Sequence, residues 1–121
     1  MVVTKPVEVQ FEPGAWARLD PSDYLQINVK IDFDDYAIGK QTYNYRHKDG
    51  SFAAELAKAR TFCQLRDVKL MQNAGLALGG SLNNAIVVDD GKILNDGGLR
   101  VEREFVRHKV LDCLGLSLIH I

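Results

Sequence analysis

The feature that most constrains the fold is the stretch 24–33, in which apolar and polar residues alternate. The apolar set shares one face and consists of Leu25, Ile27, Val29, Ile31 and Phe33. A period of two is typical of a β-strand that buries one face and leaves the other in water. A lone strand cannot bury that face, so we expect a sheet with a second layer of structure packed on it.

Three further segments predict strands before residue 47. The alternating run Val7–Phe11 and the run Trp16–Leu19 are separated by residues 12–14, whose types favour a turn. A third candidate strand covers Gln41–Arg46. These short connections fit a mainly antiparallel sheet.

The middle of the chain predicts helices and a hairpin. The Ala-rich run 53–59 predicts a helix with Ser51 as its N-cap. A second short helix is expected from residue 64 or 65 to Asn73. A buried strand at Ala85–Val88 and a short partner strand at Lys92–Leu94 are expected to form a hairpin, followed by a turn at 95–98.

The last predicted element is a helix from Val101 to Leu114, ended by Gly115. Its apolar stripe consists of Phe105, Val106, Val110, Leu111 and Leu114. We expect the apolar residues 116–121 to form no helical turn. The order of elements predicts an α+β fold, a two-layer sandwich of a mainly antiparallel sheet with two main helices plus a small βαβ insert.

Composition excludes several classes of protein. The chain has 121 residues, enough for one domain, with 46% hydrophobic and 26% charged residues. A net charge of −1 argues against a generally basic nucleic-acid binder. We expect no membrane span, since no apolar run reaches the roughly 18 to 20 residues required. Cys63 and Cys113 lie far apart in the sequence, which is typical of reduced thiols in a cytosolic protein.

Two residues of the last predicted helix have metal-ligand spacing. His108 and Asp112 are four residues apart, so both project from one helical face. An imidazole nitrogen and a carboxylate oxygen in this arrangement bind zinc, although a solvated surface pair has the same spacing. A catalytic zinc ion needs three protein ligands, so this pair alone is incomplete.

The segment after the Ala-rich run offers a second candidate site. The hydroxyl of Thr61 is suited to donate to a developing oxyanion, and the ring of Phe62 to stack on a sugar. The structural alternative is that Thr61 ends the helix and Phe62 fills the core. The small residues 78–81 favour a tight turn, or a close approach of the backbone to a ligand.

Several segments, taken in order, resemble the second domain of the zinc-dependent UDP-3-O-acyl-N-acetylglucosamine deacetylases of lipid A biosynthesis. The resemblance covers residues 5–115 and is densest in Ala59–Phe62, Arg66-Asp67, Gly75–Ser81, Ala85–Asp90, Leu94-Asn95, Gly98–Arg100, Glu104–Lys109 and Asp112. It implies an incomplete second domain at 1–115 with a βαβ insert at about 63–88. Residues 116–121 form an unmatched tail that we expect to be truncated or foreign.

The resemblance also implies roles for individual residues. His108 and Asp112 match zinc ligands, and iron(II) is an alternative metal. Thr61 matches a residue that holds the oxyanion, Phe62 one that contacts the glucosamine ring, and Lys109 one that contacts the nucleotide sugar. The insert is expected to form a passage for the acyl chain. Its lining would consist of Leu65, Val68, Ala77, Gly80, Ser81, Ala85 and Val87.

The family's remaining site residues have no counterpart here. The third ligand and the general base belong to the first domain, and a late histidine lies beyond the matched region. Gln64 and Leu116 also stand where the family has Phe and Asp. We therefore expect a cytoplasmic fragment from a Gram-negative-type bacterium, inactive alone. The alternative is a non-catalytic module that binds acyl chains or nucleotide sugars.

Overall fold

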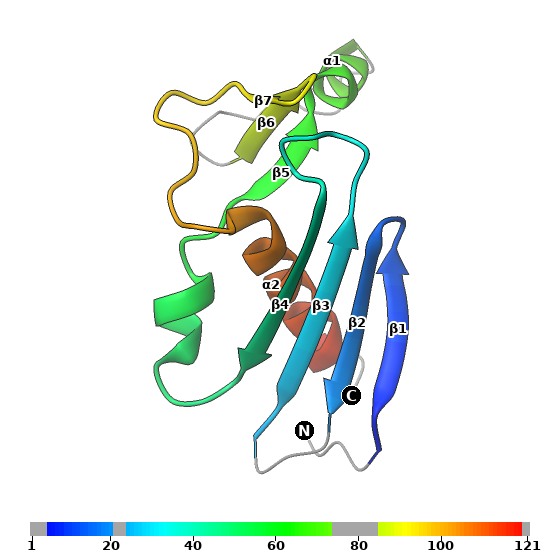
Figure 1. The fold of residues 1–121 in the computed structure, drawn as a ribbon, viewed down its shortest axis with the longest axis vertical. Coiled ribbons are helices and arrows are strands. Elements are labelled where there is room, and N and C mark those ends of the chain that lie inside the picture. The colour runs from blue at the N-terminus through cyan, green and yellow to red at the C-terminus, as the bar shows by residue number, and fades with distance from the viewer. Residues whose placement is uncertain (1–4, 21–23, 74–84, 120–121) are drawn as a thin grey trace.

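A computed structural model describes residues 5–20, 24–73 and 85–119, and it contains two sheets. The first has the order β1-β2-β3-β4, and the second has the order β5-β6-β7 (Figure 1). The strands of the first sheet are β1 (Val7–Glu12), β2 (Ala15–Asp20), β3 (Gln26–Asp32) and β4 (Lys40–Arg46). The remaining elements are the π-helix η1 (Phe52–Leu56), β5 (Thr61–Gln64), α1 (Leu65–Asn73), β6 (Ala85–Asp89), β7 (Lys92–Ile93) and α2 (Glu104–Ile119). The α+β fold predicted from the sequence is confirmed.

The first sheet is an antiparallel meander with one apolar face. Each strand pairs with the next along the chain. The alternation in β3 has the predicted consequence, because Ile27, Val29 and Ile31 are all buried. Helix α2 crosses this face and packs on β3 and β4 (Figure 1). The helix thus supplies the second layer of the sandwich.

Helix α2 buries the predicted apolar stripe but has different ends. Phe105, Val106, Val110 and Leu114 are buried, and Leu111 packs against the same core. The helix begins at Glu104 rather than residue 101 and continues through Gly115 to Ile119. The predictions of a stop at Gly115 and of no helix after it were wrong. A glycine ends a helix when it turns left-handed, and Gly115 has no positive φ.

The Ala-rich run forms much less helix than its propensity predicts. It contains only the single wide turn of η1, in which the amide of Ala57 donates to the carbonyl of Phe52 at 2.9 Å. Ser51 is itself helical and makes no side-chain cap, so its predicted role as N-cap was wrong. Short helices are marginal without tertiary packing, and here only Leu56 within the turn is buried.

The second sheet contains the predicted βαβ unit. Strands β5 and β6 are parallel and are joined through α1, and β7 pairs antiparallel with β6. Asp90 and Gly91 have φ values of 48° and 79°, which is the left-handed pair that a tight hairpin turn requires. The predicted hairpin is therefore confirmed. The described residues contain no helix long and apolar enough to cross a membrane.

Candidate metal and substrate site

The two predicted metal ligands lie side by side on α2. His108 Nε2 is 3.1 Å from Asp112 Oδ1. Two ligands that bind one tetrahedral zinc ion at about 2.0–2.1 Å lie about 3.3 Å apart, so the observed separation fits a shared ion. The spacing of four residues produces this geometry because it places both side chains on one face, one turn apart.

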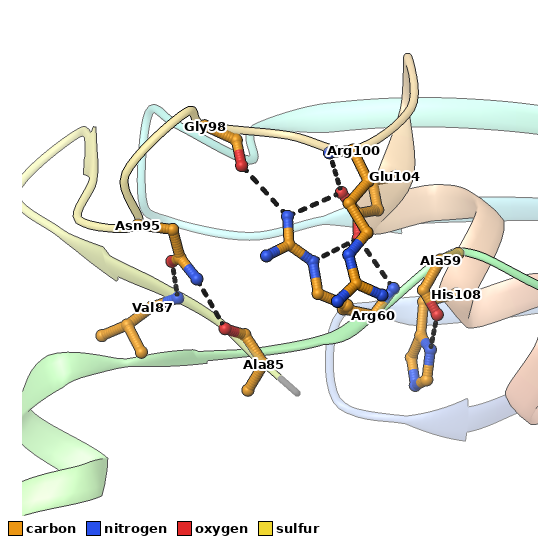
Figure 2. A network of polar contacts seen from close by, with 9 residues as sticks. All are labelled: Ala59, Arg60, Ala85, Val87, Asn95, Gly98, Arg100, Glu104 and His108. Carbon is orange, nitrogen blue, oxygen red and sulfur yellow. Dashed lines mark hydrogen bonds and ion pairs between the residues drawn. The ribbon is translucent and has the colours of Figure 1, made fainter. Parts of the chain in front are cut away.

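The other nitrogen of His108 is held by the backbone. Its Nδ1 atom lies 3.2 Å from the carbonyl oxygen of Ala59, in the segment between η1 and β5 (Figure 2). A carbonyl oxygen only accepts, so this hydrogen bond places the proton on Nδ1. In the neutral ring the lone pair is then on Nε2, which faces Asp112. Metal-binding histidines use this same arrangement.

Asp112 is held in its ionised form. Burial acts to raise its pKa, but a His108 ring protonated on both nitrogens donates from Nε2 and adds its charge to that of Lys109, and together these outweigh burial and lower the pKa below its ordinary value. The carboxylate also accepts from Lys109 Nζ at 3.2 Å. Asp112 thus presents an anionic oxygen beside the imidazole, which is the chemical character that a divalent cation requires.

Lys109 is buried and paired, which the sequence did not predict. Only 8% of the residue is exposed, and its ammonium contacts the carboxylates of Glu12 and Asp112. It also lies 4.9 Å from the centre of the Phe62 ring. A contact of Lys109 with a nucleotide sugar stays a prediction, because its three known contacts are all within this chain.

Thr61 and Phe62 open strand β5. Thr61 is exposed at the first strand residue, so the reading that it ends the Ala-rich helix was wrong. Phe62 is partly buried between the rings of Phe33 and Phe105, at centroid distances of 5.3 and 5.1 Å. This packing agrees with the alternative that Phe62 fills the core, and it also places the ring near Lys109. Contact with a sugar stays a prediction.

A buried ion pair beside this site was missed by the sequence reasoning. Figure 2 shows the guanidinium of Arg60 against the carboxylate of Glu104, with Nε 2.8 Å from Oε2. Nearby, the side-chain amide of Asn95 makes two hydrogen bonds to the backbone of β6. It accepts from the amide of Val87 and donates to the carbonyl of Ala85. The only signal in the sequence was that all three polar residues lie inside the motif segments, where the sequence reasoning gave them no role.

The described residues contain no group of three or more His, Cys, Asp or Glu side chains placed to hold a metal ion. The pair on α2 therefore needs at least one more ligand from outside this set. A model of the UDP-3-O-acyl N-acetylglycosamine deacetylase (LpxC) family matches residues 1–120. The chain belongs to this family.

Curated relatives in the LpxC family agree with this assignment. Each of three is named UDP-3-O-acyl-N-acetylglucosamine deacetylase, and each match covers 95% of this chain. The proteins of Campylobacter jejuni and Campylobacter fetus are each 48% identical, and that of an Anaeromyxobacter species is 49% identical. The chain spans only 38–39% of the length of these relatives.

The residues predicted to line an acyl passage in this LpxC-family chain are only partly described. Leu65 and Val68 are partly buried on α1, and Ala85 and Val87 lie on the neighbouring strand β6. Ala77, Gly80 and Ser81 lie outside the described residues, as does the predicted turn at 78–81. The βαβ unit therefore brings four of the seven residues onto adjacent elements, and the passage itself stays a prediction.

Proposed function

We propose that this chain supplies part of the active site of a metal-dependent deacetylase in lipid A biosynthesis. The substrate is UDP-3-O-acyl-N-acetylglucosamine, from which the enzyme removes the N-acetyl group in the bacterial cytoplasm. The observation that carries the metal assignment is the 3.1 Å pair of His108 and Asp112, with Nδ1 of the histidine fixed by a backbone carbonyl. Family membership supports the reaction.

His108 Nε2 and Asp112 Oδ1 are the atoms that would hold the metal, which is zinc or, alternatively, iron(II). When bound, such an ion lowers the pKa of a coordinated water and polarises the amide carbonyl. The hydroxyl of Thr61 is exposed and free to donate to the oxyanion that develops on that carbonyl. Phe62 and Lys109 orient the sugar end of the substrate, with Lys109 supplying the positive charge.

The rest of the proposed site comes from outside this chain. The relatives are more than twice as long. The resemblance to the family implies a third ligand and a general base in a first domain. A shared site of this kind predicts weak metal binding and essentially no turnover by the 121 residues alone. The first domain of the same enzyme is therefore the partner that we propose.

Metal binding and turnover test the proposal separately. Titration of the chain with Zn²⁺ or Co²⁺ is expected to show weak binding that H108A and D112A each abolish. The control variant H47A changes a histidine that follows β4 and contacts the Tyr45 hydroxyl, and it is expected to bind as the parent does. Deacetylation is expected only from a full-length protein that contains this chain, and H108A is expected to lower kcat there by about 100-fold or more. Turnover by the chain alone, or unchanged metal binding in H108A, would overturn the proposal.

A non-catalytic binding module is the second candidate function. It is favoured by the βαβ unit, whose strands β5 and β6 pair within this chain. Such a module binds a fatty acid or a uridine nucleotide without any metal. Titrations of the chain with a long-chain hydroxy acid and with UDP test the module, since no binding, or binding only when the first domain is added, would contradict it.

A further inference from the structure

One peptide unit is held between two side chains of α2. The Ala59–Arg60 peptide presents its carbonyl to His108 Nδ1 at 3.2 Å and its amide to Glu104 Oε2 at 2.8 Å (Figure 2). A peptide unit is planar, and in the trans form its N–H and C=O point in opposite directions. Fixing the direction of the amide therefore also fixes the direction of the carbonyl.

Glu104 is placed to hold that amide firmly. Its side chain has no exposed surface, and each of its oxygens accepts two hydrogen bonds. Oε2 accepts from the amide and Nε of Arg60, while Oε1 accepts from Nη2 of Arg60 and the amide of Arg100. Charged hydrogen bonds in a buried site are strong and directional, so the carboxylate has little freedom to turn.

Glu104 and His108 are also one helical turn apart, which links the two contacts mechanically. The residue between the loop and the helix, Arg103, has a φ of 57°, a conformation that non-glycine residues seldom adopt. Such a conformation persists where the surrounding contacts determine it. The start of α2 is therefore held in place by more than its own helical hydrogen bonds.

We propose that Glu104 is a positioning residue for His108. Its carboxylate orients the Ala59–Arg60 peptide so that the Ala59 carbonyl accepts the Nδ1 hydrogen, and the ring is thereby held with Nε2 facing the position beside Asp112 that the metal would occupy. The same contact sets the position of Thr61, the next residue along the chain. This inference rests on the proposed function only where it concerns the metal.

Stability alone is a weak explanation for the pair. Replacing both partners of a buried ion pair by apolar groups is often neutral or stabilising. A purely stabilising pair also needs no contact with the backbone, whereas Glu104 accepts two backbone amides, from Arg60 and Arg100. The first of these belongs to the peptide unit that contacts His108.

The tautomer of His108 tests the inference directly. Because the Asp112 carboxylate 3.1 Å from Nε2 also accepts a hydrogen, long-range ¹H–¹⁵N spectra are recorded on D112A, at a pH where the ring is neutral, and are expected to show a proton on Nδ1 and none on Nε2. In E104Q the amide group has one acceptor oxygen and cannot accept on both sides. The Nε2–H form is therefore expected to rise in E104Q/D112A relative to D112A, and the affinity for Co²⁺ is expected to fall by about ten-fold or more in E104Q.

Two further variants separate positioning from stability. R60K retains the backbone amide and a positive charge but loses the guanidinium fork, so it is expected to lower stability and leave the tautomer unchanged. E8Q removes an exposed carboxylate that pairs with Arg18 at 3.4 Å and is expected to change neither. If E104Q does not fold, E104D keeps the charge and withdraws it from the amide, and the same shift in tautomer is expected.

The outcomes are distinct from those of the proposed function. A D112A ring protonated on Nε2, or a folded D112A chain in which E104Q or E104D leaves the tautomer unchanged, would overturn the positioning role. A shifted tautomer together with no Co²⁺ binding by the wild-type chain or by a full-length protein that contains it would support positioning and contradict the metal site.

Discussion

Glu104 is an acidic residue whose charge is retained in the interior. Burial by itself acts to raise its pKa, but the hydrogen bonds from Arg60 and Arg100 and the charge of Arg60 hold the pKa below its ordinary value. A carboxyl whose pKa is lower in the folded state stabilises the fold fully above its unfolded pKa, which is about 4.3. That contribution disappears as the pH falls through the folded pKa.

We expect E104Q to change both the size and the pH dependence of stability. Near neutral pH it should lower the free energy of unfolding by about 3 kcal/mol, because Arg60 stays buried with its main partner neutralised. From about pH 5 down to about pH 2 the wild-type free energy should fall more steeply than that of E104Q. Urea unfolding at a series of pH values measures both, and parallel curves would contradict the role of Glu104.

The contact of Glu12 with Lys109 could not be predicted from the sequence. Glu12 lies 97 residues before Lys109, yet its carboxylate contacts the buried ammonium. We expect E12Q to destabilise the chain by about 1–2 kcal/mol, because a partly buried charge loses one of two partners. The control E8Q removes an exposed pair with Arg18 and should leave the urea midpoint unchanged. Equal midpoints for the two variants would show that the Glu12 contact contributes nothing.

Distance along the chain explains which site residues were predictable. His108 and Asp112 belong to one helix, so their spacing determines their proximity. Arg60 and Glu104 are 44 residues apart, and only the packing of β5 beside α2 brings them together. No local pattern contains that information, so the sequence could predict the candidate ligand pair but not the residues that support it.

At the scale of elements, strands were predicted better than the ends of helices. In β3 the apolar residues of the alternating pattern are the buried ones, so the pattern predicts directly which face of the strand packs on the core. Helix ends depend on backbone conformations that residue type only favours. Ser51 makes no cap and Gly115 ends no helix, because the packing of Leu56, Cys113 and Leu114 determines where these segments run.

Gly115 provides a test of the corrected helix. A Cβ added there meets no atom within 4 Å, and the residue has no positive φ. We expect G115A to raise the free energy of unfolding by up to about 1 kcal/mol, the difference in helix propensity between the two residues. G14A is the matched control and should destabilise, because Gly14 has a φ of 83° and its added Cβ would lie 2.8 Å from the Asp32 carbonyl oxygen. Thermal melts of both variants measure the effects, and a destabilised G115A would argue against a helix that continues past residue 115.

At the scale of the whole molecule, one edge of the sandwich is incompletely covered. Val7 and Val9 pair with Leu19 and Ala17, so they lie on the same face as the core. Their exposed fractions are nevertheless 48% and 42%, while Leu19 and Ala17 are buried. Strand β1 is also the end strand of its sheet. An apolar edge strand is prone to pair with another chain.

We therefore expect the isolated 121-residue chain to self-associate through β1. The double variant V7T/V9T keeps the shape and the strand propensity of both residues but makes the edge polar, so it should shift the chain toward monomer. The control L70Q removes an exposed leucine from α1, whose exposed fraction is 66%, and should leave association unchanged. Sedimentation velocity over a concentration series measures the shift. If L70Q shifts the chain toward monomer and V7T/V9T does not, then the contact is formed by α1 rather than β1. That result would exclude the edge of the sheet from the interface.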